Sequence, residues 1–150
     1  MLKIISFTNI GKKKFPLYFY IITKKGFNLI GMGDKERIYE VIMNLLSNAI
    51  KYTPSNGQIS IKSEIRDNNY VISVKDNGIG LIKDEKEKIF KKFGKIERYG
   101  KGMDAVSKGS GLGLYISKKI IEFLGGNIWV ESKGRDKGST FYFSLQIIKK

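Results

Sequence analysis

The stretch NLLSNAIKYT, Asn44–Thr53, carries two asparagines four residues apart and a lysine at the end of an apolar helical repeat. The repeat has three- and four-residue steps, which predict an amphipathic helix that begins after the N-cap Asp34 and ends before Pro54. The predicted buried face consists of Ile38, Val41, Ile42, Leu45, Leu46 and Ala49. This pattern predicts that one face of the helix lies in the core.

A second face of the same helix is polar. At about 100° of rotation per residue, Asn44, Asn48 and Lys51 fall within roughly 60°, away from the apolar stripe, and Tyr52 lies at the boundary. An asparagine oxygen is a hard neutral ligand suited to Mg²⁺, and a lysine ammonium can bind phosphate. The face therefore suits a metal–nucleotide, but these residues could equally solvate a surface helix, and the helix alone does not decide.

Strands and a second helix follow along the chain. Ile59–Ile65 and Tyr70–Asp76 alternate as two strands around a turn, which predicts a β-hairpin. A second amphipathic helix is expected to stop at Gly125-Gly126, before strands in NIWVES and STFYFSLQI. Its predicted apolar residues are Leu112, Tyr115, Ile116, Ile120, Phe123 and Leu124. This order predicts an α+β fold, a two-layer α/β sandwich with helices on one face of a mixed, mostly antiparallel sheet.

Two further segments lie outside these elements. Residues 81–110 are polar, basic and glycine-bearing, with a short helical patch around EKIFKKF, Glu87–Phe93, which predicts a long lid or mobile loop. Residues 1–14 are predicted to be a linker or flanking segment. A chain of 150 residues otherwise has the size of one domain with one core, so we expect 1–150 to be a single domain.

Two glycine-containing stretches carry further chemistry. In DNGIG, Asp76–Gly80, a carboxylate precedes two glycines, so the backbone could approach a flat ligand while Asp76 accepts from an amino group such as that of adenine. The same letters also suit an ordinary turn. GSGLGL, Gly109–Leu114, opens the second helix, where free amides and the helix dipole favour phosphate. It fits neither a dinucleotide fingerprint nor a P-loop.

Taken together and in this order, these stretches resemble the ATP-binding catalytic domain of sensor histidine kinases, in the superfamily of DNA gyrase, Hsp90 and MutL. The resemblance covers about Leu29 to Ile148 and includes IFKKF and the closing GSTFYFSL. It implies a Bergerat-type fold with a flexible ATP lid over residues 81–110, and Mg²⁺ and ATP as cofactors.

By position, the resemblance implies that Asn48 binds magnesium, that Asn44 and Lys51 contact the phosphate chain, and that Tyr52 packs beside the purine. Asp76 would read adenine, with Thr140 nearby. The glycine-rich residues implied in the pocket and at the lid's end are Gly78, Gly80, Gly109, Ser110, Gly111, Leu112, Gly113 and Leu114.

The lid departs from the family's commonest pattern, in which an arginine and an aromatic follow the phenylalanine-containing box. Lys92, Gly94 and Lys95 occupy those places. A lysine can neutralise a γ-phosphate but lacks the bidentate fork of arginine. Lys92, Lys95 and Arg98 are therefore candidates, and the alternative is that they are solvated lid charges.

The chain contains neither cysteine nor histidine. Disulfides, thiolate or histidine metal sites, and a phosphoryl-accepting histidine within this chain are thus excluded. The resemblance implies a histidine-bearing dimerisation domain as partner and a response regulator receiver domain downstream. We expect a cytoplasmic domain without membrane contact, whose parent protein could be membrane-anchored.

The net charge of +14 leaves other function classes to weigh. Lysines spread along the chain favour a solvated surface that attracts anionic ligands, and Phe15–Thr23 favours an apolar strand over a stacking surface for single-stranded nucleic acid. We therefore expect no nucleic-acid partner. The alternative within the superfamily is a gyrase- or Hsp90-like ATPase, for which Glu40 is the candidate base near Asn44.

Overall fold

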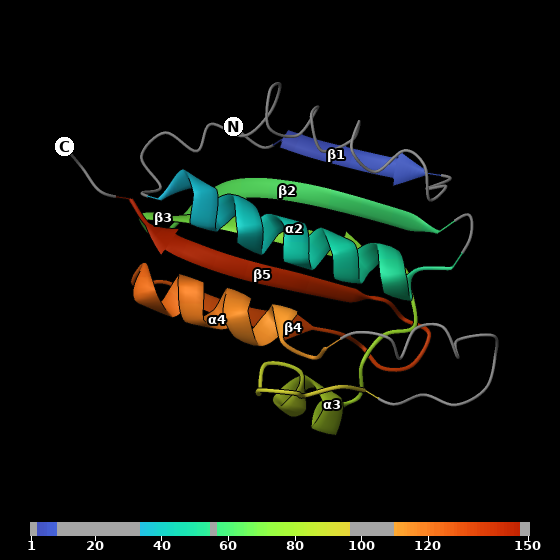
Figure 1. Ribbon diagram of the computed structural model, residues 1–150. Helices are drawn as coiled ribbons and strands as arrows, with labels where there is room; N and C mark the ends of the chain where they lie inside the picture. The colour runs from blue at the N-terminus through green and yellow to red at the C-terminus, as the bar shows by residue number, and fades with distance from the viewer. Residues whose placement is uncertain (1–2, 9–33, 55–56, 97–109, 148–150) are drawn as a thin grey trace.

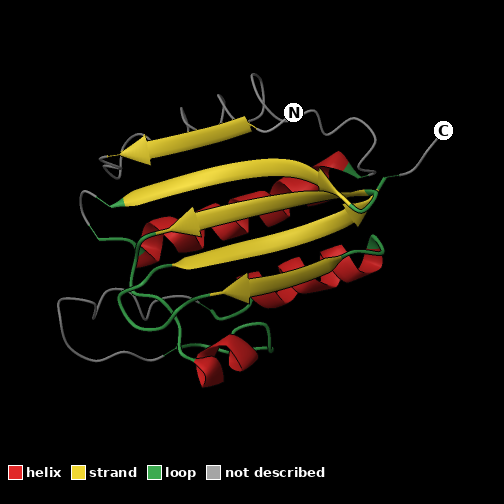
Figure 2. Cartoon of the chain, turned by 180° about the vertical axis from the view of Figure 1, so that it is seen from behind, coloured by secondary structure: helices red, strands yellow, loops and turns green. Residues whose placement is uncertain are grey.

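The computed structural model describes residues 3–8, 34–54, 57–96 and 110–147 (Figure 1). Its five strands pair in the order β1-β2-β3-β5-β4, and each of these pairings is antiparallel. The strands are β1 Lys3–Thr8, β2 Gln58–Arg66, β3 Asn69–Asp76, β4 Asn127–Glu131 and β5 Ser139–Gln146. The helices are α2 Lys35–Tyr52, α3 Lys83–Lys88 and α4 Gly113–Phe123. Figure 2 shows α2 and α4 together on one face of the sheet, which confirms the predicted two-layer α+β fold.

Helix α2 has the boundaries and the buried face that the sequence predicts. The Asp34 carboxylate accepts from the backbone N–H of Arg37 at 3.2 Å, which caps the first turn. The six buried residues of the helix are the six predicted ones: Ile38, Val41, Ile42, Leu45, Leu46 and Ala49. They join one core cluster with the inward side chains of β2, β3 and β5, so α2 is fixed on the middle of the sheet.

The β2–β3 hairpin is also as predicted. Asp67 and Asn68 form its turn with φ of 48° and 61°. Two successive left-handed residues match the twist of the paired strands, and Asp and Asn tolerate this region better than most residues. The hairpin register carries β3 to its end at Asp76, which pairs with Ile59.

Helix α4 corrects the prediction of its buried face. Its buried side chains are Ser117, Ile120 and Ile121. The sequence predicts burial of Ile116 and Phe123, and this is wrong: they are 39% and 74% exposed. Because α4 packs against α2 as well as the sheet, its buried stripe runs through a small polar residue that a count of apolar positions omits.

The structure corrects the expectation that residues 1–14 form only a linker or flanking segment. Lys3–Thr8 forms β1, the edge strand, which pairs with β2 from Lys3↔Ser63 to Thr8↔Gln58. Two adjacent isoleucines in a six-residue segment give no clean alternation, so the pattern does not indicate a strand. Residues 1–2 and 9–14 lie outside the described part of the chain, as does Phe15–Thr23.

The first half of the predicted lid is attached to the domain. Helix α3 begins four residues before the predicted patch Glu87–Phe93 and lies outside the two layers (Figure 1). Leu81 and Ile89, on either side of it, are buried in the core. Residues 97–109, including Arg98 and Gly109, lie outside the described residues. No helix in the described part of the chain combines the length and apolarity needed to cross a membrane.

Candidate functional site

The end of β3 holds a buried carboxylate. Asp76 is 5% exposed, and its Oδ1 accepts from the backbone N–H of Gly78 at 2.8 Å. Burial raises the pKa of this carboxyl group, and the backbone N–H groups of Gly78 and Ser139 partly oppose the shift. A carboxylate has about four acceptor positions, so Asp76 retains acceptor capacity for a ligand N–H.

Two glycines let the backbone pack tightly beside this carboxylate. A Cβ on Gly78 would lie 2.2 Å from the carbonyl oxygen of Tyr52, and one on Gly80 would lie 2.0 Å from that of Gly134. Gly80 also has φ of +62°, a left-handed conformation that favours glycine. The glycines therefore let the segment after β3 fit between the end of α2 and the β4–β5 loop.

The structure corrects the predicted partner of Asp76. Asp76 pairs across the strands with Ser139, whereas Thr140 pairs with Lys75. Directly paired residues share a face of the sheet and successive residues alternate, so Thr140 points away from Asp76. Ser139 is buried, and the alternation of apolar residues along STFYFSL would have predicted this inward position.

The polar face of α2 meets the start of α4. Asn44, Asn48, Lys51 and Tyr52 are all partly buried. The Nδ2 of Asn44 donates to the carbonyl oxygen of Gly113 at 3.3 Å and to the Oγ of Ser117 at 3.1 Å. The face that the resemblance implies for a metal–nucleotide is therefore positioned against the glycine-rich turn that opens α4.

Lys51, in the last turn of α2, lies near a second cation, Lys95. The pKa of Lys51 is lowered by partial burial and then by the positive charge of Lys95. Gly111 lies against Lys95, because a Cβ added to this glycine would be 2.9 Å from the Cγ of Lys95. Lys92 is exposed, with its Nζ 5.4 Å from the ring centroid of Phe93. Of the lid cations in the described residues, Lys95 is the one whose charge lowers the pKa of Lys51 further, and the pair favours an anionic ligand.

The other residues predicted at the lid's end surround this turn. The backbone N–H of Leu112 donates to the Oγ of Ser110 at 3.3 Å, and Leu114 packs against the core. Within the described residues no group of three or more carboxylates could hold a metal ion alone. A magnesium ion at this site would have to take oxygen ligands from nucleotide phosphates, which is how Mg²⁺ commonly binds beside one or two protein ligands. The donor set therefore fits Mg²⁺ only together with a nucleotide.

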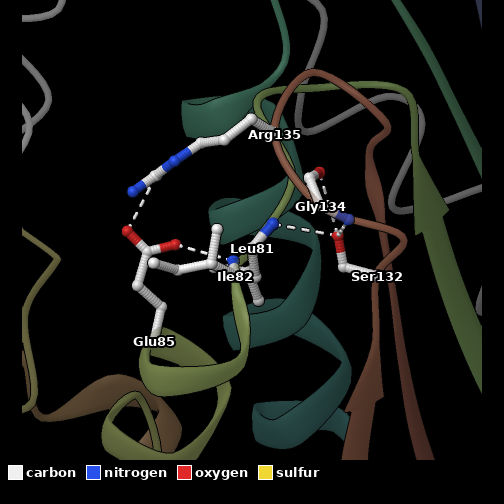
Figure 3. A network of polar contacts seen from close by, with 6 residues as sticks. All are labelled: Leu81, Ile82, Glu85, Ser132, Gly134 and Arg135. Atoms are coloured by element: carbon white, nitrogen blue, oxygen red, sulfur yellow. Dashed lines mark hydrogen bonds and ion pairs between the residues drawn. The ribbon is translucent and has the colours of Figure 1, made fainter.

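A polar network that the sequence pattern did not predict joins the β4–β5 loop to residues 81–85 (Figure 3). The Ser132 hydroxyl accepts from the N–H of Leu81 at 2.9 Å and donates to the carbonyl of Gly138 at 2.7 Å. Glu85 accepts from the N–H of Ile82 at 2.9 Å and pairs with Arg135 at 2.8 Å. The β4–β5 loop is thereby fixed to the segment that leads into α3.

Comparison with known proteins agrees with this geometry. Residues 33–148 match the family described as histidine kinase-, DNA gyrase B-, and HSP90-like ATPase. The chain belongs to this ATPase family. Among relatives within it, the adaptive-response sensory kinase SasA of Synechocystis is 40% identical over 118 residues, which cover 78% of this chain and 29% of SasA. The sensor histidine kinase WalK of Bacillus subtilis is 37% identical over 114 residues, covering 75% of this chain and 18% of WalK.

Solved structures of the ATPase family give the same result. The nucleotide-free catalytic domain of histidine kinase ThkA superposes with a TM-score of 0.64 at 28% identity, over 97% of this chain and 98% of that domain. Full-length ShkA in complex with AMPPNP gives 0.65 at 25% identity, over 78% of this chain and 23% of ShkA. The chain spans less than a third of the length of SasA and WalK. It is an ATP-binding domain of the sensor histidine kinase type, and these relatives favour that function over the gyrase- or Hsp90-like alternative.

Proposed function

We propose that this domain binds Mg-ATP and donates the γ-phosphoryl group to a histidine on a dimerisation domain outside this chain. The proposal rests on two features that meet at the C-terminal end of α2. One is the buried carboxylate of Asp76, and the other is the pair of cations Lys51 and Lys95. The carbonyl of Tyr52 accepts from Ile79 N–H at 3.2 Å, which joins the helix to the Asp76 pocket. Partial burial and then the charge of Lys95 lower the pKa of the neighbouring Lys51. A ligand with a base at one end and phosphates at the other matches this arrangement.

Each residue has a role that follows from its chemistry. Asp76 accepts from the adenine amino group, with Ser139 beside it and Tyr52 against the purine. Lys51 and Lys95 neutralise the phosphates. The amide oxygen of Asn48 would bind Mg²⁺, which when present adds further neutralisation of the phosphate charge. Phosphoryl transfer depends mainly on such positioning and charge neutralisation, so no base from this domain is required.

The proposed transfer balances without a further reactant. An imidazole nitrogen of the acceptor attacks the γ-phosphorus, the N–P bond forms, and the bond from phosphorus to the bridging oxygen breaks with its electrons leaving on ADP. The proton left on the imidazole ring passes to water or to a base on the acceptor's own domain. The chain has no histidine, so the acceptor belongs to another domain. That phosphohistidine would then supply a response regulator receiver domain. The need for ATP and for such a partner favours a cytoplasmic location.

Calorimetric titration with ATP, ADP and GTP, with and without Mg²⁺ and at two salt concentrations, tests the binding step. We expect saturable, adenine-selective binding that Mg²⁺ alters. The transfer step is then tested by adding a histidine-bearing dimerisation domain and measuring its phosphorylation. Absence of binding at millimolar nucleotide would contradict the proposal. Salt-sensitive binding of polyanions, indifferent to ATP, would instead support a nucleic-acid-binding module.

A further inference from the structure

The contact between Asn44 and the first turn of α4 determines which atom of Asn44 faces the nucleotide. A backbone carbonyl only accepts hydrogen bonds, so the group 3.3 Å from the Gly113 oxygen must be the amide nitrogen. This network, rather than the shape of the amide, sets the assignment of nitrogen and oxygen. The same nitrogen reaches the Oγ of Ser117 at 3.1 Å. An amide nitrogen has two hydrogens, and these two partners use both of them.

The oxygen of Asn44 is therefore the atom left for a ligand. Oδ1 lies 3.7 Å from the position that a Cβ on Gly113 would take, at the turn where the lid ends. An oxygen with only acceptor capacity repels phosphate oxygens but binds Mg²⁺ or the hydrogens of its water ligands. This chemistry differs from the contact with the phosphate chain that the resemblance implies for Asn44.

Ser117 is the second residue that accepts a hydrogen bond from the Asn44 amide. It is 0% exposed and lies on the stripe of α4 that packs toward α2. Buried hydroxyl groups are kept in hydrogen bonds, and here Ser117 accepts from a side chain 73 residues away. Without this acceptor, one amide hydrogen of Asn44 loses its partner, and the Gly113 carbonyl alone holds the orientation of the amide.

We propose that Ser117 is a positioning residue for the Mg-nucleotide site: with the carbonyl of Gly113 it holds the Asn44 amide so that Oδ1 faces the metal ion or its waters. This inference rests on the proposed function. Ser117 touches no ligand in this scheme and acts only through Asn44. Asn44 becomes a second oxygen donor beside Asn48, on the same face of α2 and one helical turn away.

The test is the ratio of ATP affinity with Mg²⁺ to that without it, measured by calorimetry on the whole chain. Ser117→Ala should lower this ratio about two- to tenfold, the weight of one hydrogen bond. The affinity for metal-free ATP should stay near that of the parent chain. An unchanged ratio in a folded Ser117→Ala variant would overturn the proposal.

A matched pair separates orientation from packing. Ser117→Thr and Ser117→Val add the same bulk, but only threonine keeps the hydroxyl, so threonine should retain the Mg²⁺ ratio and valine should lose it. Equal losses in both would mean that Ser117 only fills space, which contradicts the proposal.

Asn44→Ala tests the other end of the contact. Its loss of ATP affinity should appear only with Mg²⁺, whereas an equal loss with and without Mg²⁺ would show a phosphate contact and overturn the assignment. If the parent chain bound no nucleotide, the proposed function itself would fail, and that outcome is distinct from all of these.

Discussion

The two ends of the proposed nucleotide site are built in different ways. At the adenine end, backbone groups hold Asp76 and Ser139, the glycines at 78 and 80 pack against other carbonyls, and the Ser132 network braces the loop behind them. At the phosphate end, partly exposed side chains gather two positive charges that disfavour each other. Folding therefore holds the adenine end in place, whereas at the phosphate end a bound anion would offset the repulsion between Lys51 and Lys95. Preorganised recognition of the base and ligand-stabilised recognition of the phosphates should respond differently to mutation.

The largest effect is expected where the adenine end is packed most tightly. Gly80→Ala would place a Cβ 2.0 Å from the Gly134 carbonyl, at a residue with φ of +62°. The steric clash and the left-handed backbone together should cost about 3 kcal/mol or more of the free energy of unfolding and abolish ATP binding. Denaturant titration and calorimetry measure the two losses.

Gly125→Ala is the matched control for this substitution. Gly125 has φ of +78°, but a Cβ there would meet nothing within 4 Å. Only the backbone penalty of about 1–2 kcal/mol should remain, with ATP affinity preserved. Equal costs in both variants would mean that the close approach to Gly134 contributes nothing, and that the adenine end is less rigid than its geometry indicates.

Asp76→Asn should separate ligand binding from stability. A charge-assisted hydrogen bond to adenine would be lost, which should weaken ATP about ten- to 100-fold. Because the folded pKa of Asp76 is raised, its stabilising contribution is present at acid pH and is lost as pH rises through that pKa. The ionised form thus lowers stability at neutral pH, and the neutral amide should leave the denaturation midpoint unchanged or higher.

Asp67→Asn, in the exposed turn between β2 and β3, is the control for Asp76→Asn and should change neither property. A sharp fall in the denaturation midpoint of Asp76→Asn, with the control unaffected, would make Asp76 a structural turn carboxylate instead.

A smaller and more selective effect is expected at Asn48. Asn48→Ala removes an amide oxygen from the polar face of α2, so the affinity for Mg-ATP should fall about tenfold while metal-free ATP changes little. Calorimetry with Mg²⁺ and with a chelator measures both. The neighbouring exposed Ser47, changed to alanine, should match the parent chain. Equal losses with and without Mg²⁺ would count against Asn48 as the metal ligand.

How far the sequence predicts the molecule also differs between regions. Helix α2 and the β2–β3 hairpin follow from the sequence, because Asp34 caps the helix, its buried residues form one apolar stripe, and two turn residues accept left-handed φ. In α4 the same counting fails, since contact with α2 and the sheet together buries Ser117 and leaves Phe123 exposed. Periodicity does not report which neighbours a helix has.

The adenine side shows a related limit. The sequence predicts the carboxylate at the end of β3, but which of Ser139 and Thr140 lies beside it depends on strand register. One residue of shift exchanges the faces of a strand. The bracing by Ser132 and Glu85 is not visible in any local pattern, because its partners lie up to 51 residues apart. Local rules thus predict individual elements, and the contacts between elements determine the site.

The smallest predicted effect sharpens the contrast at the phosphate end. Removing the charge with Lys95→Ala should weaken ATP about two- to fivefold, since exposed charge pairs are weak, and added salt should reduce the difference. It should also raise the pKa of Lys51 toward its usual 10.5, as one of the two causes of its lowering is gone. A lysine with a lowered folded pKa costs stability below that pKa, and the cost disappears as pH rises toward 10.5. Lys95→Ala should therefore be slightly more stable than the parent at neutral pH while binding ATP more weakly. NMR titration of the lysine side chains and denaturant melts measure the two changes.

Lys92→Ala, which removes an equal charge beside Phe93, should leave the Lys51 titration unchanged. If the two variants shifted Lys51 alike, the cations would act as a diffuse field, and the phosphate end would lack the defined pair that distinguishes it from the rest of this basic surface.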